Sequence, residues 1–195
     1  MEKILKILII IVSLCIYLNA EFAVKSYYEI KNERVVRQSY EESCGASSIA
    51  TLINLFDIKK YSESDILNYL LDDNKTINTN MVSFKELKEV LNKIGYESNG
   101  YQMDRNLFDK LNIPVIVKVE NDPRYPHFVV AINHKGDFIT ILDPSFGEYI
   151  SLKNDFFNLW DRQGNGGYAL IVAPNIKNIN LYNKLKLPNK ILFEK

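Results

Sequence analysis

Apolar residues in the first half of the chain recur three or four positions apart, as they do along one face of a helix. In the segment Cys44–Phe56 the apolar positions are 46, 49, 50, 52, 53 and 56, which predicts an amphipathic helix with Ser43 as its N-cap. Capping and stop signals predict three further helices: from Ser62 or Ser64 through Leu71, from the capping box of Ser83 and Glu86 to Ile94 before Gly95, and from Asp104 to about Leu111.

The pattern changes in the second half, where short apolar runs are separated by turn residues, as is typical of strands. The runs 127–132 and 138–142 flank a polar turn and are predicted to form an antiparallel hairpin. Helices followed by antiparallel strands predict an α+β fold, with N-terminal helices packed on a C-terminal antiparallel sheet. Further strands are predicted at 114–119 and 168–173 and a short helix at 155–160, whereas the tail 175–195 gives no clear prediction.

The N-terminal segment has the layout of a secretory signal peptide. Lys3 and Lys6 form a short basic region, residues 7–18 are almost wholly apolar, and Ala20 offers a small residue for cleavage. The apolar run of about a dozen residues is shorter than the roughly 20 that a membrane span needs. Residues 1–20 are therefore predicted to be a signal peptide that directs the protein to the periplasm or the exterior. A signal anchor that stays uncleaved is the alternative.

Composition and charge indicate a globular domain. Of 195 residues 47% are hydrophobic, and 24 Lys and Arg balance 24 Asp and Glu, so that the formal net charge is +0. These values exclude intrinsic disorder, and a chain without excess positive charge is not expected to bind nucleic acid. Residues 21–195 are enough for one well-packed domain and too few for two. A single domain is predicted there, with its core at about 36–173.

The cysteines narrow the choice of chemistry. The chain has two, Cys15 and Cys44, and Cys15 would leave with the signal peptide. An exported chain with one thiol cannot form an internal disulfide, so Cys44 is a buried filler, an intermolecular link or a reactive group. At the first turn of its predicted helix, backbone N–H groups and the helix dipole favour a thiolate, which is the nucleophilic form. Gly45 is expected to leave room there for a substrate backbone.

Three other residues are predicted to complete a site around Cys44. His127 opens a strand and is held rigidly enough to act as a base, whereas His134 lies in a polar turn and is expected to be solvated. Asp143 ends the next strand of the hairpin, which returns it to the start of the His127 strand, where it can orient the ring. Gln38 can place its amide beside the Cys44 N–H, and two such donors form an oxyanion hole.

The segments that carry these residues, 38–46, 126–130 and 142–144, resemble the bacteriocin-processing cysteine peptidases that cut after a double-glycine leader. These papain-like domains usually form the N-terminal part of peptide-exporting ABC transporters, and the resemblance covers about residues 36–173. It implies that Gln38 donates to the oxyanion, Cys44 is the nucleophile, His127 is the base and Asp143 orients it, as in the general cysteine–histidine arrangement.

Two features depart from the transporter form. The sequence has a signal-like N-terminus and shows no transporter or ATPase segment, and Glu42 and Ser43 stand where an acidic residue commonly precedes the cysteine directly. These departures bear on the leader-peptide substrate more than on the fold or the chemistry.

The function predicted is that of an exported papain-like cysteine peptidase that needs no metal or cofactor. Its partner would be a peptide or protein substrate, with a secretion system as a further candidate, no nucleic acid, and membrane contact only through an uncleaved signal. One alternative is a catalytically silent module that binds a secreted peptide; intact Gln38, Cys44, His127 and Asp143 argue against it. The other is a cell-wall amide hydrolase, which uses a similar cysteine–histidine pair.

Overall fold

The structure is a computed structural model, and it describes residues 3, 4, 6, 7, 24–57, 59–70, 82–120 and 124–172. Most of the predicted signal peptide, Cys15 and the tail 175–195 lie outside the described residues. The chain divides into two units, residues 1–30 and residues 31–195. Among the residues that the structure describes, no helix has the length and apolar character needed to cross a membrane.

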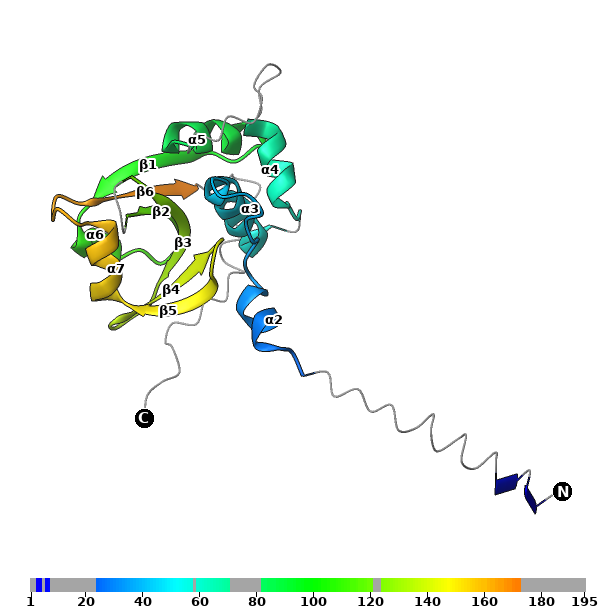
Figure 1. Cartoon of the computed structure of the whole chain (residues 1–195). Helices are drawn as coiled ribbons and strands as arrows, with labels where there is room; N and C mark the ends of the chain where they lie inside the picture. Colours follow the sequence, from blue (N-terminus) through cyan, green and yellow to red (C-terminus); the bar gives the residue numbers. More distant parts are fainter. Residues whose placement is uncertain are drawn as a thin grey trace. The chain divides into compact units, whose positions relative to one another are not determined.

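The larger unit is built on one antiparallel sheet of six strands, as Figure 1 shows. The strands lie side by side in the order β1-β6-β2-β3-β4-β5, and every neighbouring pair is antiparallel. Their bounds are β1 (Ser98–Met103), β2 (Val115–Val119), β3 (His127–Asn133), β4 (Phe138–Asp143), β5 (Gly147–Leu152) and β6 (Gly167–Val172).

Helices cover both faces of this sheet. Three of them, α3, α4 and α5, share a hydrophobic core with one face, and α6 and α7 share a core with the other. The helices are α2 (Tyr27–Asn32), α3 (Cys44–Phe56), α4 (Glu63–Leu70), α5 (Phe84–Lys93), α6 (Arg105–Asp109) and α7 (Lys153–Trp160). The α+β fold predicted from the sequence is therefore confirmed.

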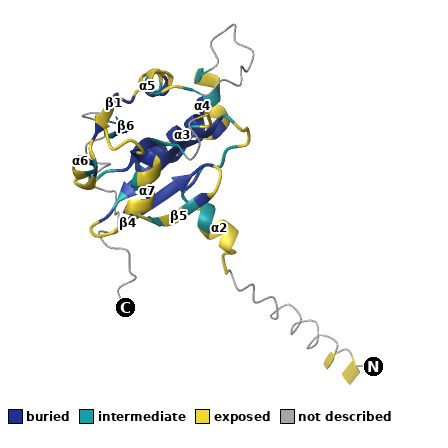
Figure 2. Cartoon of the chain, turned by 60° about the vertical axis from the view of Figure 1, so that its left-hand side comes forward, coloured by how far each residue is buried: buried dark blue, intermediate teal, exposed yellow. Residues whose placement is uncertain are grey.

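The two cores follow from the alternation of side chains along the strands. On β2, Ile116 belongs to the core beneath α3, whereas its neighbours Val115 and Val117 belong to the core beneath α7. Figure 2 shows α3 as buried over most of its length. A helix this deeply embedded holds the residue at its N-terminus, Cys44, in a fixed place against the sheet.

Gly45 is required by packing. A Cβ at this position would lie 2.5 Å from Val82 Cγ2 and 2.9 Å from Leu87 Cδ2, closer than real side chains approach. The sequence suggested that this glycine leaves room for a substrate backbone. The structure corrects that interpretation, because the missing side chain leaves room for Val82 and for a leucine of α5.

Most of the predicted elements are present. The helix Cys44–Phe56 and the hairpin of β3 and β4 match their predicted bounds closely, and the capping box of Ser83 and Glu86 makes both of its expected hydrogen bonds. Among the elements that the structure describes, three were not predicted, namely α2 and the two edge strands β1 and β5. The edge strands mix polar and apolar residues without a clear period, because much of each edge strand is exposed to solvent.

Candidate active site

Cys44 is the first residue of α3 and is 4% exposed. The loop before it is held by Glu63, a carboxylate that is itself only 5% exposed. Glu63 accepts hydrogen bonds from the Ser39 N–H at 2.8 Å and from the Ser43 hydroxyl. Ser43 occupies the predicted N-cap position, but its side chain makes no capping bond, and its hydroxyl lies within hydrogen-bond distance of Glu63 and of the Tyr40 carbonyl.

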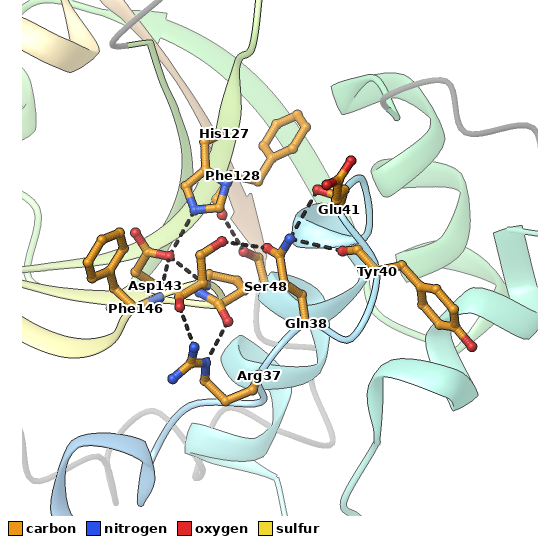
Figure 3. Close-up of polar contacts among 11 residues, drawn as sticks. Arg37, Gln38, Tyr40, Glu41, Ser48, His127, Phe128, Asp143 and Phe146 are labelled. Atoms are coloured by element: carbon orange, nitrogen blue, oxygen red, sulfur yellow. Dashed lines mark hydrogen bonds and ion pairs between the residues drawn. The ribbon is translucent and has the colours of Figure 1, made fainter. Parts of the chain in front are cut away.

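His127 and Asp143 meet at one end of the hairpin. Antiparallel pairing of β3 and β4 brings the end of β4 back to the start of β3, and His127 Nε2 lies 2.9 Å from Asp143 Oδ1 (Figure 3). The same carboxylate oxygen accepts the N–H groups of Ser145 at 2.7 Å and Phe146 at 3.1 Å. Asp143, 6% exposed, is therefore a buried carboxylate whose orientation is set by three donors.

The electrostatics of this pair favour two charged groups. Burial lowers the pKa of His127, but hydrogen bonds to Asp143 and Cys44 and the charges of both partners outweigh burial and raise this pKa to about 9. Burial raises the pKa of Asp143, while the hydrogen bond and charge of His127 and two backbone N–H groups lower it below its ordinary value. Because Nε2 contacts Asp143, Nδ1 is the ring nitrogen left for Cys44.

The raised pKa predicts how stability depends on pH. The unfolded pKa is 6.5 and the folded value about 9, so the imidazolium contributes its full stability below pH 6.5 and loses it as pH rises through 9. The pH-dependent part of the difference in unfolding free energy between wild type and His127→Ala should reach at most about 3 kcal/mol near pH 6. Urea denaturation between pH 5 and 10 measures it, and a difference that does not change with pH would contradict the charged pair.

Gln38 lies beside the same turn, but its amide already has partners. Nε2 donates to the carbonyls of Tyr40 at 2.9 Å and Glu41 at 3.0 Å, and Oε1 accepts from the Ser145 hydroxyl at 2.9 Å (Figure 3). To donate to an oxyanion, the amide has to exchange one of these carbonyls for the substrate oxygen. The oxyanion role of Gln38 stays a prediction.

The sequence predicts that the second histidine, His134, is solvated, but in the structure it is buried. His134 does follow β3 in a turn, but it is 6% exposed, and its Nε2 lies 2.8 Å from Thr140 Oγ1. Lys153 Nζ donates to the backbone carbonyl of His134 at 2.6 Å. It sits at the opposite end of β3 from His127 and belongs to the packing of the sheet. A local polar pattern could not reveal this, since Lys153 is distant in sequence.

Sequence reasoning missed Glu63 altogether. An acidic residue at the first turn of a helix normally faces solvent, and nothing local signals that this one is buried against the loop that carries Ser43. Within the described ranges, no group of three or more His, Cys, Asp or Glu side chains is arranged to hold a metal ion.

A thiol at the N-terminus of a buried helix, beside a His–Asp pair on an antiparallel sheet, is the arrangement typical of papain-like cysteine peptidases. Comparison with family models leads to the same class. The model of the Peptidase C39 family matches residues 32–177, and the chain belongs to this family.

Individual relatives agree with this placement. The probable functional amyloid protease FapD of Pseudomonas fluorescens is 29% identical over 140 residues, which are 71% of this chain and 62% of FapD. The chain thus matches less than two thirds of that protein's length. Among solved structures, the peptidase domain of Streptococcus ComA, a bifunctional ABC transporter involved in quorum sensing, is similar with a TM-score of 0.61 at 23% identity, covering 73% of this chain and 98% of that domain.

A second solved structure has the same fold. A double glycine motif protease from an AMS/PCAT transporter, in complex with its leader peptide, is similar with a TM-score of 0.57 at 23% identity. The match covers 72% of this chain and 91% of that one. At these identities the two structures establish the shared fold.

Proposed function

We propose that this protein is an exported cysteine peptidase that cuts a peptide bond by thiolate attack. The observation that supports this most directly is the 2.9 Å contact between His127 Nε2 and Asp143, on a histidine whose raised pKa also reflects the Cys44 thiol. A histidine held between a carboxylate and a thiol has the protonation and the orientation needed to donate a proton to a leaving group.

The proposed reaction has two halves. The Cys44 sulfur bonds to the carbonyl carbon of the scissile peptide, and the oxyanion that forms is held by the Cys44 N–H and the Gln38 amide. His127 passes its proton to the leaving amine, the C–N bond breaks, and an acyl-enzyme thioester remains. Water then gives a proton to His127 and its oxygen to the acyl carbon, which releases the acid and restores the thiolate.

The proposed substrate is a secreted peptide or protein. One relative is named a functional amyloid protease, and one similar structure contains a leader peptide. A component of a secretion system is a candidate partner on the same grounds. Glu42 and Ser43, which stand before Cys44 in place of a single directly preceding acidic residue, allow a cleavage sequence different from the double-glycine type.

The proposal is tested by incubating the protein, under reducing conditions, with peptides recovered from the exported fraction and identifying new peptide termini by mass spectrometry. New termini are expected with wild type. Binding without any new terminus would indicate a silent peptide-binding module, and cleavage of cell-wall amides in place of peptides would indicate an amide hydrolase.

N-terminal sequencing tests export: a start near Glu21 is expected, whereas Met1 on membrane-bound material would indicate a retained anchor.

The oxyanion role of Gln38 predicts a separate result. Gln38→Ala should lower peptide cleavage by about 100-fold to 1,000-fold, because one of two donors to the oxyanion is lost. Alkylation of Cys44 should stay close to wild type, since nucleophile and base remain. Ser145→Ala is the matched control, because it removes the hydroxyl that donates to Gln38 Oε1 but leaves the amide in place. Unchanged cleavage in Gln38→Ala would contradict the oxyanion role and leave this side chain only its contacts with Tyr40, Glu41 and Ser145.

A further inference from the structure

Arg37, directly before Gln38, uses all three nitrogens of its guanidinium group. Nε donates to the Pro144 carbonyl at 2.8 Å, Nη2 donates to the Ser145 carbonyl, and Nη1 donates to Asn32 Oδ1 at 2.9 Å. Figure 3 shows the guanidinium group beside the turn that joins β4 to β5. Two of its three contacts therefore reach the backbone that directly follows Asp143.

The same two peptide groups bind Asp143 on their other side. The peptide with the Pro144 carbonyl also carries the Ser145 N–H, and the next peptide carries the Ser145 carbonyl and the Phe146 N–H. These N–H groups donate to Asp143 Oδ1 at 2.7 and 3.1 Å. Because the N–H and the carbonyl of a trans peptide point in opposite directions, each peptide links Arg37 to Asp143.

The linkage continues to the histidine. Asp143 Oδ1, which receives both N–H groups, is also the atom 2.9 Å from His127 Nε2. The Gln38 N–H donates to the Pro144 carbonyl as well, at 3.1 Å, so the segment that follows Arg37 is bound to the same turn. One guanidinium group thus connects the orienting carboxylate with the chain that leads to Cys44.

We propose that Arg37 is a positioning residue for the His127–Asp143 pair and acts through these two peptide groups. A cation that donates to a carbonyl polarises the peptide and strengthens the hydrogen bond made by its N–H group. The planar guanidinium fork also fixes the directions of both carbonyls at once, which a single ammonium cannot do. The inference rests on the proposed function, in which the pair serves the Cys44 thiol.

The positive charge of Arg37 and the shape of its guanidinium group have separate effects on the protonation of His127, and the test has to distinguish them. Cys44 from α3 and Asp143 from β4 contact His127, and Tyr149 from β5 lies near Asp143. Removing a positive charge near this group would by itself favour the imidazolium, which opposes the effect of a less well oriented carboxylate. Arg37→Lys keeps the charge and removes the fork, so this variant isolates the positioning effect.

In Arg37→Lys, kcat for a peptide that the wild type cuts should fall roughly 10-fold to 100-fold, with KM changed less than about twofold. The titration midpoint of the His127 ring, followed by NMR, should lie below that of wild type. The chain contains two histidines, so the His134→Ala variant assigns the signals. Amide hydrogen exchange at Ser145 and Phe146 should become faster.

Arg34→Lys is the matched control. Arg34 lies in the same segment and pairs with Glu148, with Nε 2.9 Å from Oε2, but no described contact joins it to the peptides after Asp143. This variant should keep the wild-type kcat and the wild-type His127 midpoint. An equal loss in both lysine variants would overturn the proposal, as would wild-type kcat and midpoint in a folded Arg37→Lys.

The test does not depend on a known substrate. If the wild type cuts no peptide, the proposed function fails, yet the His127 midpoint and the amide exchange still decide the role of Arg37. If Arg37→Lys does not fold, amide hydrogen exchange of the wild type tests the proposal. The proposal requires the N–H groups of Ser145 and Phe146 to be protected from exchange. Exchange at the rate of free loop amides in the wild type would overturn the proposal.

Discussion

Cys44→Ala is expected to abolish cleavage of every peptide that the wild type cuts, a loss of roughly 1,000-fold or more. Alanine has no sulfur to form the acyl-enzyme, so neither half of the proposed reaction can proceed. The fold should persist, because replacing a small buried side chain by a slightly smaller one costs about 1 kcal/mol of unfolding free energy. Peptide cleavage followed by mass spectrometry and urea denaturation measure the two effects.

Ser47→Ala provides the matched control for this variant. Ser47 is buried on the same helix, and its hydroxyl has no hydrogen-bond partner among the described residues. Its removal should therefore leave both stability and cleavage close to wild type. Turnover by Cys44→Ala of any substrate of the wild type would rule out the thiol mechanism.

His127→Ala is expected to lower kcat by about 100-fold to 10,000-fold, because it removes the group that protonates the leaving amine. His134→Ala should keep the cleavage rate per folded molecule but lower the unfolding free energy by about 1–3 kcal/mol, since it breaks a buried contact with Thr140. Initial rates and urea denaturation of both variants separate the two roles.

Asp143→Asn should give a cleavage rate between those of His127→Ala and His134→Ala, since an amide can still orient the ring.

If His134→Ala lost catalysis while His127→Ala kept it, the roles assigned to the two histidines would be exchanged. The fold makes that outcome unexpected, because the two side chains lie at opposite ends of β3.

The positions of Cys44, His127 and Asp143 on their elements could be predicted from the sequence because each one depends on local chain geometry. The period of apolar residues placed Cys44 at the first turn of a helix, and the structure begins α3 at that residue. The hairpin signal placed Asp143 beside His127, and antiparallel pairing of β3 and β4 brings them to 2.9 Å. Helix period and strand alternation are short-range properties, so a local pattern is sufficient to determine them.

The environments of these residues depended on the tertiary structure. The sequence predicted a solvated His134, but in the structure its ring contacts Thr140 of β4 and its carbonyl accepts a hydrogen bond from Lys153 of α7. The sequence predicted that the Gln38 amide donates to an oxyanion, whereas in the structure the carbonyls of Tyr40 and Glu41 accept its N–H groups. Burial and partner choice are set by residues distant in sequence.

The sequence by itself determined helices α3 to α7, the inner strands, the α+β class and the positions of Cys44, His127 and Asp143 on these elements, because periodicity, capping and turn residues act over a few residues. Only the tertiary structure decided the edge strands β1 and β5, the burial of Glu63 and the contacts of Arg37 with the turn after Asp143. Each of these depends on contacts between segments that are far apart in the chain. Such contacts form when the sheet brings those segments together, and no local pattern specifies them.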